Sequence, residues 1–138
     1  TEFIGEFNGI NFYDDYGHHP TEIKATTKAL KEHTQGKLIV VFQPHRYTRT
    51  RDNFNDLSKS FEYSDLTLIT DIYSAGEKPI PGVSSLMFES EKIKYVKSPR
   101  MLPPYLKNNI SPGDTVLTIG AGDITLLGPQ ILKYLNEN

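Results

Sequence analysis

The sequence has 138 residues, the usual length of one folded domain and enough to bury a hydrophobic core. Its 15 basic and 17 acidic side chains give a net charge of −2, so no positive excess favours nucleic acid or an anionic membrane. The absence of cysteine excludes disulfides and thiolate metal sites and suits the cytoplasm. No apolar run approaches the roughly 20 residues of a membrane span. We therefore expect a single cytoplasmic domain over 1–138, without nucleic-acid or membrane partners.

Short apolar runs alternate with segments of helical periodicity, which is typical of strands and helices that alternate around a parallel sheet. Strands are expected in an extended segment at the start of the chain and at 10–13, 37–44, 65–73, 93–96 and the stretch beginning at Asp114. Helices are expected at 21–33, at 50–63, in a short piece near 84–89, from about Pro103, and near the end of the chain. Gly128 and Pro129 indicate that the last helix is kinked or starts late.

The run 37–44 is apolar almost throughout, as expected of a central strand that is buried on both faces. Together the elements predict the α/β class, namely a three-layer α/β/α Rossmann-like sandwich. Its sheet is expected to be mostly parallel and six-stranded, with one antiparallel edge strand. Ligands of such sheets bind beyond the carboxyl ends of the strands, so the loops at these ends are the place to look for function.

Three chemically rich loops each follow an expected strand. They are DDYGHHP at 14–20, QPHRYTRTR at 43–51 and GAGDI at 120–124. If their strands are parallel neighbours, the three loops meet at one edge of the sheet. The sequence therefore predicts a pocket that combines carboxylates, imidazoles, guanidinium groups and backbone N–H groups.

The second loop carries a local cationic cluster on a weakly acidic chain, with Arg46, Arg49 and Arg51 beside His45. Arg46 and Arg49 are three residues apart, so in a helical turn they would share a face and could hold one anion. Guanidinium groups bind carboxylate and phosphate oxygens in bidentate fashion. The alternative is a solvated helix start with the arginines paired to Asp52 or Asp56. Arginine is unfavourable near the positive end of a helix dipole, a conflict that a bound anion would relieve.

The first loop allows three interpretations. Asp14, Asp15, His18 and His19 could bind a divalent metal ion, although adjacent histidines point in different directions and no HxH or HxxxH spacing is present. The histidines could instead cap the following helix while the acids lie in solvent. In the third interpretation an acid binds a pair of ribose hydroxyls, and tyrosine and histidine line a substrate pocket. The GAGDI turn would let the backbone approach an anion, but glycines in such turns are often required by sterics alone.

These interpretations give three classes of function. The chain could be part of an enzyme that binds a nucleotide and a carboxylate, a non-catalytic α/β module that recruits a carboxylated or phosphorylated partner, or a small metal hydrolase. The second class does not explain the acid-rich loop, and the third does not explain the arginines.

Four motifs, in this order and spacing, resemble the C-terminal domain of the Mur ligase family over nearly the whole chain. They are DDYGHHPTE at 14–22, FQPHRYTRTRD at 42–52, DIYSAGEKPIPG at 71–82 and GAGDI at 120–124. Within the family, QPHRYTR is similar to the ligases that add L-alanine to UDP-N-acetylmuramate. The recycling ligases that attach a tripeptide to the same acceptor share a similar first loop and differ at the second motif.

The resemblance implies a three-domain, ATP-dependent ligase of peptidoglycan precursor synthesis, which forms a peptide bond through an acyl phosphate. In such enzymes the P-loop lysine and most Mg²⁺ ligands lie in the central domain, and the sequence contains no GxxxxGK[ST] motif. The chain is therefore expected to be the third domain alone, inactive by itself and without a metal site. The partners implied are ATP, L-alanine, UDP-N-acetylmuramate and the ligase's own N-terminal and central domains.

The resemblance also implies roles for individual residues, with no catalytic residue in this domain alone. Asp15 would contact the ribose of ATP, supported by Asp14 and with His19 beside the nucleotide. The remaining roles concern the substrates. Tyr16 and His18 would line the alanine and muramoyl end of the cleft, and the alanine carboxylate would be held by His45, Arg46 and Arg49. The same pocket would be approached by Gly120, Ala121, Gly122 and Asp123.

Overall fold

The computed structural model describes residues 1–138, and its centre is a six-stranded sheet in the order β1-β2-β6-β3-β4-β5. β1 pairs antiparallel with β2 at one edge, and the other pairs are parallel. This confirms the mostly parallel sheet with one antiparallel edge strand. The strands are β1 Glu2–Phe7, β2 Ile10–Asp15, β3 Leu38–Gln43, β4 Leu66–Ile69, β5 Ile93–Tyr95 and β6 Thr115–Gly120.

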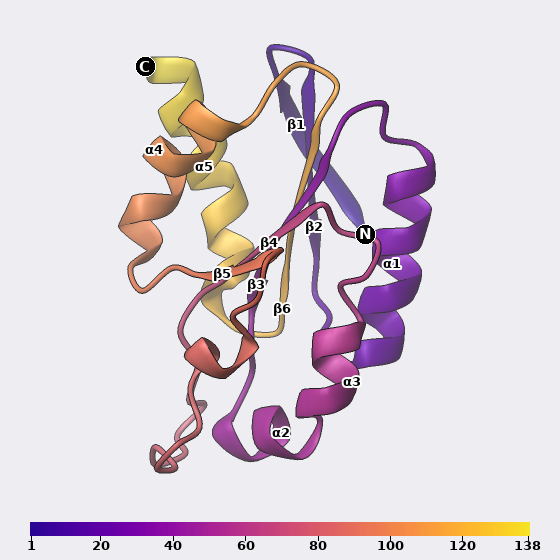
Figure 1. The fold of residues 1–138 in the computed structure, drawn as a ribbon. Helices are drawn as coiled ribbons and strands as arrows, with labels where there is room; N and C mark the ends of the chain where they lie inside the picture. Colours follow the sequence, from indigo (N-terminus) through magenta and orange to yellow (C-terminus); the bar gives the residue numbers. More distant parts are fainter.

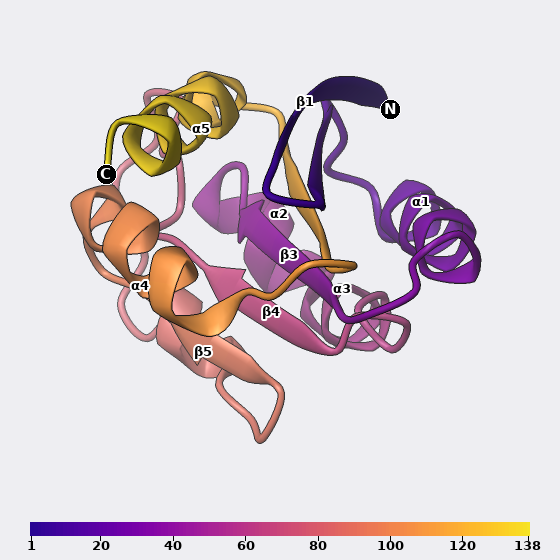
Figure 2. The ribbon, with the colours of Figure 1, turned by 90° about the horizontal axis from the view of Figure 1, so that it is seen from above.

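Helices cover both faces of the sheet, as the three-layer prediction requires. α1 and α3 lie on one face and α4 and α5 on the other, while α2 lies at the end toward which β3 points (Figures 1 and 2). The α-helices are α1 Pro20–Glu32, α2 Tyr47–Asp52, α3 Phe54–Lys59, α4 Leu102–Asn109 and α5 Leu127–Glu137. Three short 3₁₀ turns are η1 Ser85–Phe88, η2 Pro99–Met101 and η3 Asp123–Leu126. None of the helices combines the length and the apolar character needed to cross a bilayer.

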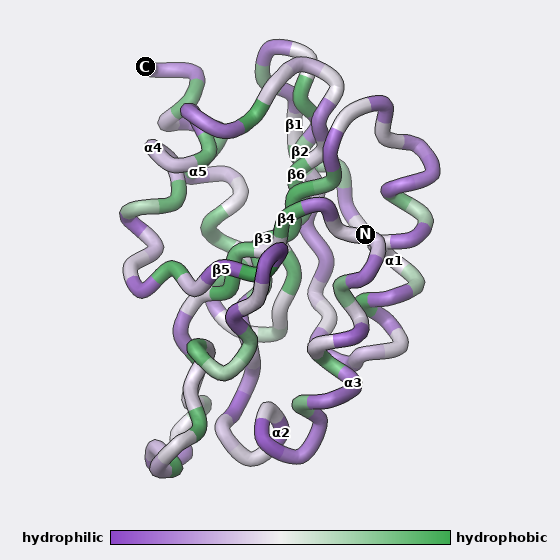
Figure 3. Tube along the Cα trace, in the orientation of Figure 1, coloured by the Kyte–Doolittle hydropathy of each residue, from purple (hydrophilic) through white to green (hydrophobic).

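The sheet separates two hydrophobic cores. Ile39 and Val41 of β3 pack into the core under α4 and α5, whereas Val40 and Phe42 pack into the core under α1 and α3. Consecutive residues of a strand point to opposite faces, so a strand between two helical layers must be apolar at every position. Apolar residues accordingly run along the central strands (Figure 3). This confirms that the run 37–44 is a central strand.

The helix expected over 50–63 is wrong in extent. The structure has two short helices, α2 and α3, that meet at Asn53 and end at Lys59. The Asn53 side-chain amide donates to the Arg49 carbonyl at 3.0 Å, and its backbone N–H donates to the same oxygen at 3.0 Å. Asparagine competes for helix carbonyls in this way and so ends α2. α2 begins at Tyr47, before the expected start, and therefore contains both Arg49 and Arg51.

Two strand ends also differ from the sequence-based expectation by two or more residues. β4 ends at Ile69, and of the remaining expected strand only Tyr73 forms an isolated bridge, to His45. β2 continues two residues beyond Tyr13, so that Asp14 and Asp15 belong to the strand.

The helix starts near the prolines are confirmed. α4 begins at Leu102, directly before Pro103 and Pro104, and α5 begins at Leu127 after a 3₁₀ turn. Prolines in a first helical turn remove no intrahelical hydrogen bond, because the N–H groups there have no partner within the helix.

Candidate functional site

The three predicted loops leave neighbouring strands at one edge of the sheet. β6 lies between β2 and β3 and pairs parallel with both, and their ends are level because Asp15 is opposite Ile119 and Gln43 is opposite Gly120. This edge, which we call the carboxyl edge, faces α2 in Figure 1. The expectation that the loops after these strands meet at one edge is therefore confirmed.

Three aromatic rings form a column at the carboxyl edge. The His18 and His45 ring centroids lie 5.9 Å apart with a 34° tilt, and the His45 ring stacks on Tyr73 at 5.6 Å and 15°. Arg49 Nη1 lies 3.2 Å from His45 Nδ1. The structure thus brings together His18 from the first loop with His45 and Arg49 from the second.

Both imidazoles of the column are held in the neutral form near pH 7. Burial is the main reason that the pKa of His18 and of His45 lies below its usual value, and the nearby Arg49 guanidinium lowers both further. His18 Nδ1 is buried and has no hydrogen-bond partner within the protein. Buried polar atoms are almost always paired with protein, water or ligand. The nitrogen therefore needs a water molecule or another bound group to satisfy it.

The arginines of the second loop divide into paired and unpaired groups. Arg51 forms an ion pair with Asp52 at 2.9 Å, as the solvated-helix alternative expects. Neither Arg46 nor Arg49 has a carboxylate within 4.0 Å. Arg46 precedes α2 with a non-helical backbone, φ 73° and ψ 142°, so the assumed helical spacing from Arg46 to Arg49 does not apply. Two guanidinium groups therefore remain free of acidic partners at the carboxyl edge.

Asp14 and Asp15 make contacts with different parts of the protein. Asp14 accepts hydrogen bonds from Thr118 Oγ1 at 2.6 Å and Thr125 Oγ1 at 2.8 Å. Asp15 accepts from Thr26 Oγ1 of α1 at 3.0 Å. Because both lie in β2, neighbouring side chains project to opposite faces of the sheet. Only Asp15 is on the side of α1, so Asp14 does not support it by direct contact.

His19 caps α1, as the second interpretation of the first loop proposes for the histidines. Its Nδ1 accepts from the Thr21 N–H at 3.3 Å, and Glu22 accepts from the His19 N–H at 3.3 Å. This reciprocal pair satisfies N–H groups that the first turn leaves unpaired. Tyr16, in contrast, is 68% exposed.

The glycines of the GAGDI turn are required by packing. A Cβ on Gly120 would lie 2.7 Å from Ile124 Cγ2, and one on Gly122 would lie 2.7 Å from Tyr73 Cγ. The Gln43 side chain binds the turn through two hydrogen bonds: its Nε2 donates to Asp123 Oδ1 at 2.7 Å, and its Oε1 accepts from the Ile124 N–H at 3.2 Å. The steric interpretation of these glycines therefore applies, and it places Gly122 directly beside the aromatic column.

Sequence reasoning missed two residues of this edge, Gln43 and Tyr73. Both belong to quoted motifs, but no spacing rule indicates that Gln43 supports the GAGDI turn or that Tyr73 stacks on His45. No three His, Asp or Glu side chains are grouped so that they could hold a metal ion. The roles assigned to the individual site residues stay predictions.

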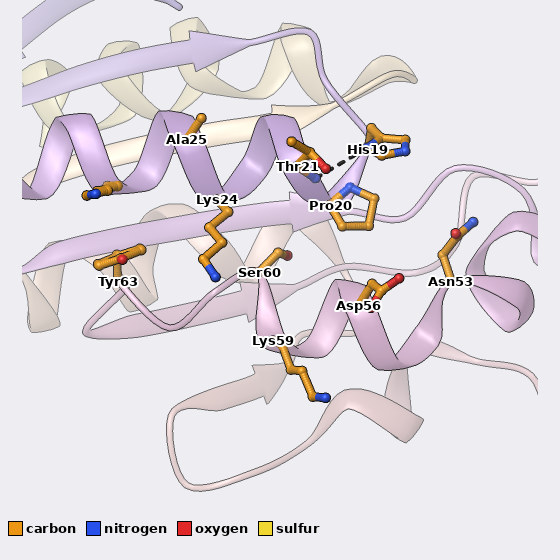
Figure 4. A pocket seen from close by; sticks show the side chains of 11 residues that line it. His19, Pro20, Thr21, Lys24, Ala25, Asn53, Asp56, Lys59, Ser60 and Tyr63 are labelled. Carbon is orange, nitrogen blue, oxygen red and sulfur yellow. Dashed lines mark hydrogen bonds between the residues drawn. The ribbon is translucent and has the colours of Figure 1, made fainter.

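A groove of about 620 Å³ lies beside this edge, between α1 and α3 (Figure 4). His19 and Asn53 line the end toward which the strands point, and Tyr63 lies at the other end (Figure 4). The lining is polar, with charged groups of both signs. The lining residues are His19, Pro20, Thr21, Lys24, Ala25, Lys28, Asn53, Asp56, Lys59, Ser60 and Tyr63.

The fold and the carboxyl edge define a Rossmann-like α/β domain whose polar loops gather at the ends of its central strands. The family model of the glutamate ligase domain of the Mur ligases matches residues 1–122. The chain thus belongs to the Mur ligase family and corresponds to its C-terminal domain.

Curated relatives agree with this assignment. The chain is 41% identical over 143 residues to a UDP-N-acetylmuramate–L-alanine ligase of Desulforamulus reducens and 46% identical over 144 residues to one of Pelotomaculum thermopropionicum. Each match covers 99% of this chain and 31% of the relative, so the chain spans about a third of their length. A murein peptide ligase structure from Psychrobacter arcticus, 20% identical, matches the fold with a TM-score of 0.77 over 99% of this chain and 30% of that one.

Proposed function

We propose that this chain is the C-terminal domain of an ATP-dependent ligase that joins L-alanine to UDP-N-acetylmuramate in bacterial peptidoglycan synthesis. The relatives that are 41% and 46% identical carry that name, and the match covers nearly the whole chain. The domain acts together with an N-terminal and a central domain in the bacterial cytoplasm.

One structural observation supports the substrate assignment most directly. Arg46 and Arg49 lack acidic partners and lie with the neutral imidazole of His45 at the carboxyl edge. Every free amino acid has a carboxylate, and guanidinium groups bind carboxylates in bidentate fashion. Gripping alanine by its carboxylate leaves its amine free to react. Such orientation is worth several kcal/mol, because well-placed reactants reach effective molarities of about 10⁵ M or more.

The proposed reaction has two steps. ATP transfers its γ-phosphoryl group to the muramoyl carboxylate, which yields ADP and an acyl phosphate. The alanine amine then attacks the acyl carbon, loses a proton and releases inorganic phosphate as the amide forms. In this domain we assign Asp15 and His19 to the nucleotide, and Tyr16 and His18 to the muramoyl and alanine end. We place Mg²⁺ with ligands of the central domain.

Phosphate release by the full-length protein tests the proposal. We expect release only when ATP, UDP-N-acetylmuramate and L-alanine are all present, and none from the 138-residue chain alone. The tripeptide L-alanyl-γ-D-glutamyl-meso-diaminopimelate serves as the competing substrate. Turnover with the tripeptide and not with alanine would assign the protein to the recycling ligases, and no turnover with either would favour a non-catalytic binding module.

A further inference from the structure

The segment that holds Arg46 and Arg49 has an unfavourable backbone. We call residues 45–49 the arginine loop. Arg46 has φ 73° and ψ 142°, a positive-φ conformation that residues with a Cβ rarely adopt. α2 follows at once, but the Arg46 side chain makes no capping hydrogen bond and the first turn of α2 contains no acid. The arginine loop therefore lacks the local interactions that normally fix such a backbone.

A second segment, 73–77, supplies these interactions from outside. The Tyr73 N–H donates to the Pro44 carbonyl at 2.8 Å, and the Tyr73 carbonyl accepts from the Arg46 N–H at 2.7 Å. The Tyr73 ring also stacks on His45. These contacts fix the start of the arginine loop.

Glu77 fixes the other end of the arginine loop. One carboxylate oxygen, Oε1, accepts from the Thr48 N–H at 3.1 Å, and the other, Oε2, accepts from Thr48 Oγ1 at 2.5 Å. Glu77 thus caps α2 in place of a residue of the helix itself. The Glu77 carboxylate is ionised near pH 7, since the hydrogen bond from the Thr48 side chain is the main cause that lowers its pKa. The Glu77 carboxylate forms no ion pair within 4.0 Å with Arg46 or Arg49, so both guanidinium groups stay free of an acidic partner.

The turn before Glu77 is shaped for this contact. Ala75 and Gly76 have positive φ values of 51° and 87°, and the Glu77 N–H donates to the Ser74 carbonyl at 3.0 Å. Two consecutive left-handed residues closed by this hydrogen bond form a type I′ turn. The turn directs Glu77 back toward α2.

We propose that Glu77 is a positioning residue for the substrate carboxylate: it holds Thr48, and through Thr48 the backbone that orients Arg46 and Arg49. The inference rests on the proposed function of the arginine loop. Glu77 itself contacts neither the carboxylate nor the reacting atoms. Its loss therefore affects binding of the amino acid more than the chemistry of ATP.

Steady-state kinetics of the full-length ligase test the inference. For Glu77→Gln, which keeps the shape and removes the charge, we expect KM for L-alanine to rise about 10-fold, with kcat and KM for ATP within about 2-fold. Glu91→Gln is the matched control, because Glu91 is an exposed glutamate outside the carboxyl edge, and it should change none of the three. Thr48→Val combined with Glu77→Gln should raise KM little further than Glu77→Gln alone, since both changes weaken the same contact between position 77 and the Thr48 side chain.

The outcomes separate this inference from the proposed function. An unchanged KM for alanine in Glu77→Gln, together with a raised KM in Arg49→Ala, would overturn the positioning role and leave the proposed function standing. An unchanged KM in both variants would overturn the proposed function and the inference with it. A fall in kcat and a rise in KM for ATP as large as the rise in KM for alanine would show a general structural role. That result would also overturn the inference. In each variant, the Thr48 amide resonance of the 138-residue chain reports whether the contact has been lost.

Discussion

Replacing Arg49 with alanine in the full-length ligase is expected to raise KM for L-alanine about 100-fold, because losing one partner of a desolvated charge pair costs roughly 2–5 kcal/mol. Arg49 also lies 3.2 Å from His45 Nδ1, so its removal frees the imidazole at the centre of the aromatic column. Arg49→Lys should raise KM for alanine less than Arg49→Ala does, since an ammonium group keeps the charge without the bidentate geometry.

Arg51→Ala is the matched control for this prediction. Arg51 belongs to the same helix, but its guanidinium is half exposed and paired with Asp52. Exposed pairs contribute about 0–1 kcal/mol, so KM for alanine should change by less than about 3-fold. Equal effects of Arg49→Ala and Arg51→Ala would contradict a specific role for Arg49.

The second large effect is expected from Gly122→Ala, through packing alone. A Cβ at this position would lie 2.6 Å from Gln43 Oε1 and 2.7 Å from Tyr73 Cγ. Gln43 cannot swing away without breaking its hydrogen bonds to Asp123 and Ile124. Overpacking of this kind costs about 1–3 kcal/mol, which corresponds to a Tm lower by roughly 3–10 °C in a domain of this size.

Thermal unfolding of the 138-residue chain measures this effect, and Gly17→Ala provides its control. A Cβ on Gly17 meets its nearest atoms at 3.5–3.8 Å, which is ordinary contact, so Tm should stay within about 2 °C. In the full-length ligase Gly122→Ala should also raise KM for alanine, because the Tyr73 ring must shift from its place on His45. An unchanged Tm would mean that the GAGDI turn is not packed against Gln43 and Tyr73 as described.

Hydrophobic patterns were sufficient to predict the fold and the location of the candidate site. The apolar run 37–44 indicates a central strand, and the rule that ligands bind at the carboxyl ends of parallel strands directs attention to three loops. The central strand is confirmed, and so is the meeting of the three loops at one edge, because β6 lies between β2 and β3 and the three strands end at the same level.

The details of the site depend on individual hydrogen bonds and on strand pairing, which hydrophobic patterns do not report. Two expected features changed for such reasons. The helix expected over 50–63 breaks because Asn53 binds the Arg49 carbonyl. Asp14 and Asp15 separate onto opposite faces because β2 extends through both, whereas the sequence pattern ended that strand at Tyr13.

The contributions of Tyr73 and Glu77 illustrate the same limit on local patterns. Each lies about 30 residues from the part of the arginine loop that it contacts, and the contacts are an aromatic stack and hydrogen bonds to a helix start. Neither kind of contact requires a fixed spacing along the chain. The motif DIYSAGEKPIPG therefore contributed to the family resemblance without indicating what its residues do.

A crystal structure of the full-length ligase with ADP and UDP-N-acetylmuramoyl-L-alanine would show directly whether the arginine loop binds the substrate carboxylate. We expect the alanine carboxylate within about 2.7–3.2 Å of guanidinium nitrogens of Arg46 or Arg49, with the adenosine ribose on the Asp15 side of the same edge. A carboxylate bound only by residues of the other domains, with both arginines directed into solvent, would contradict this expectation.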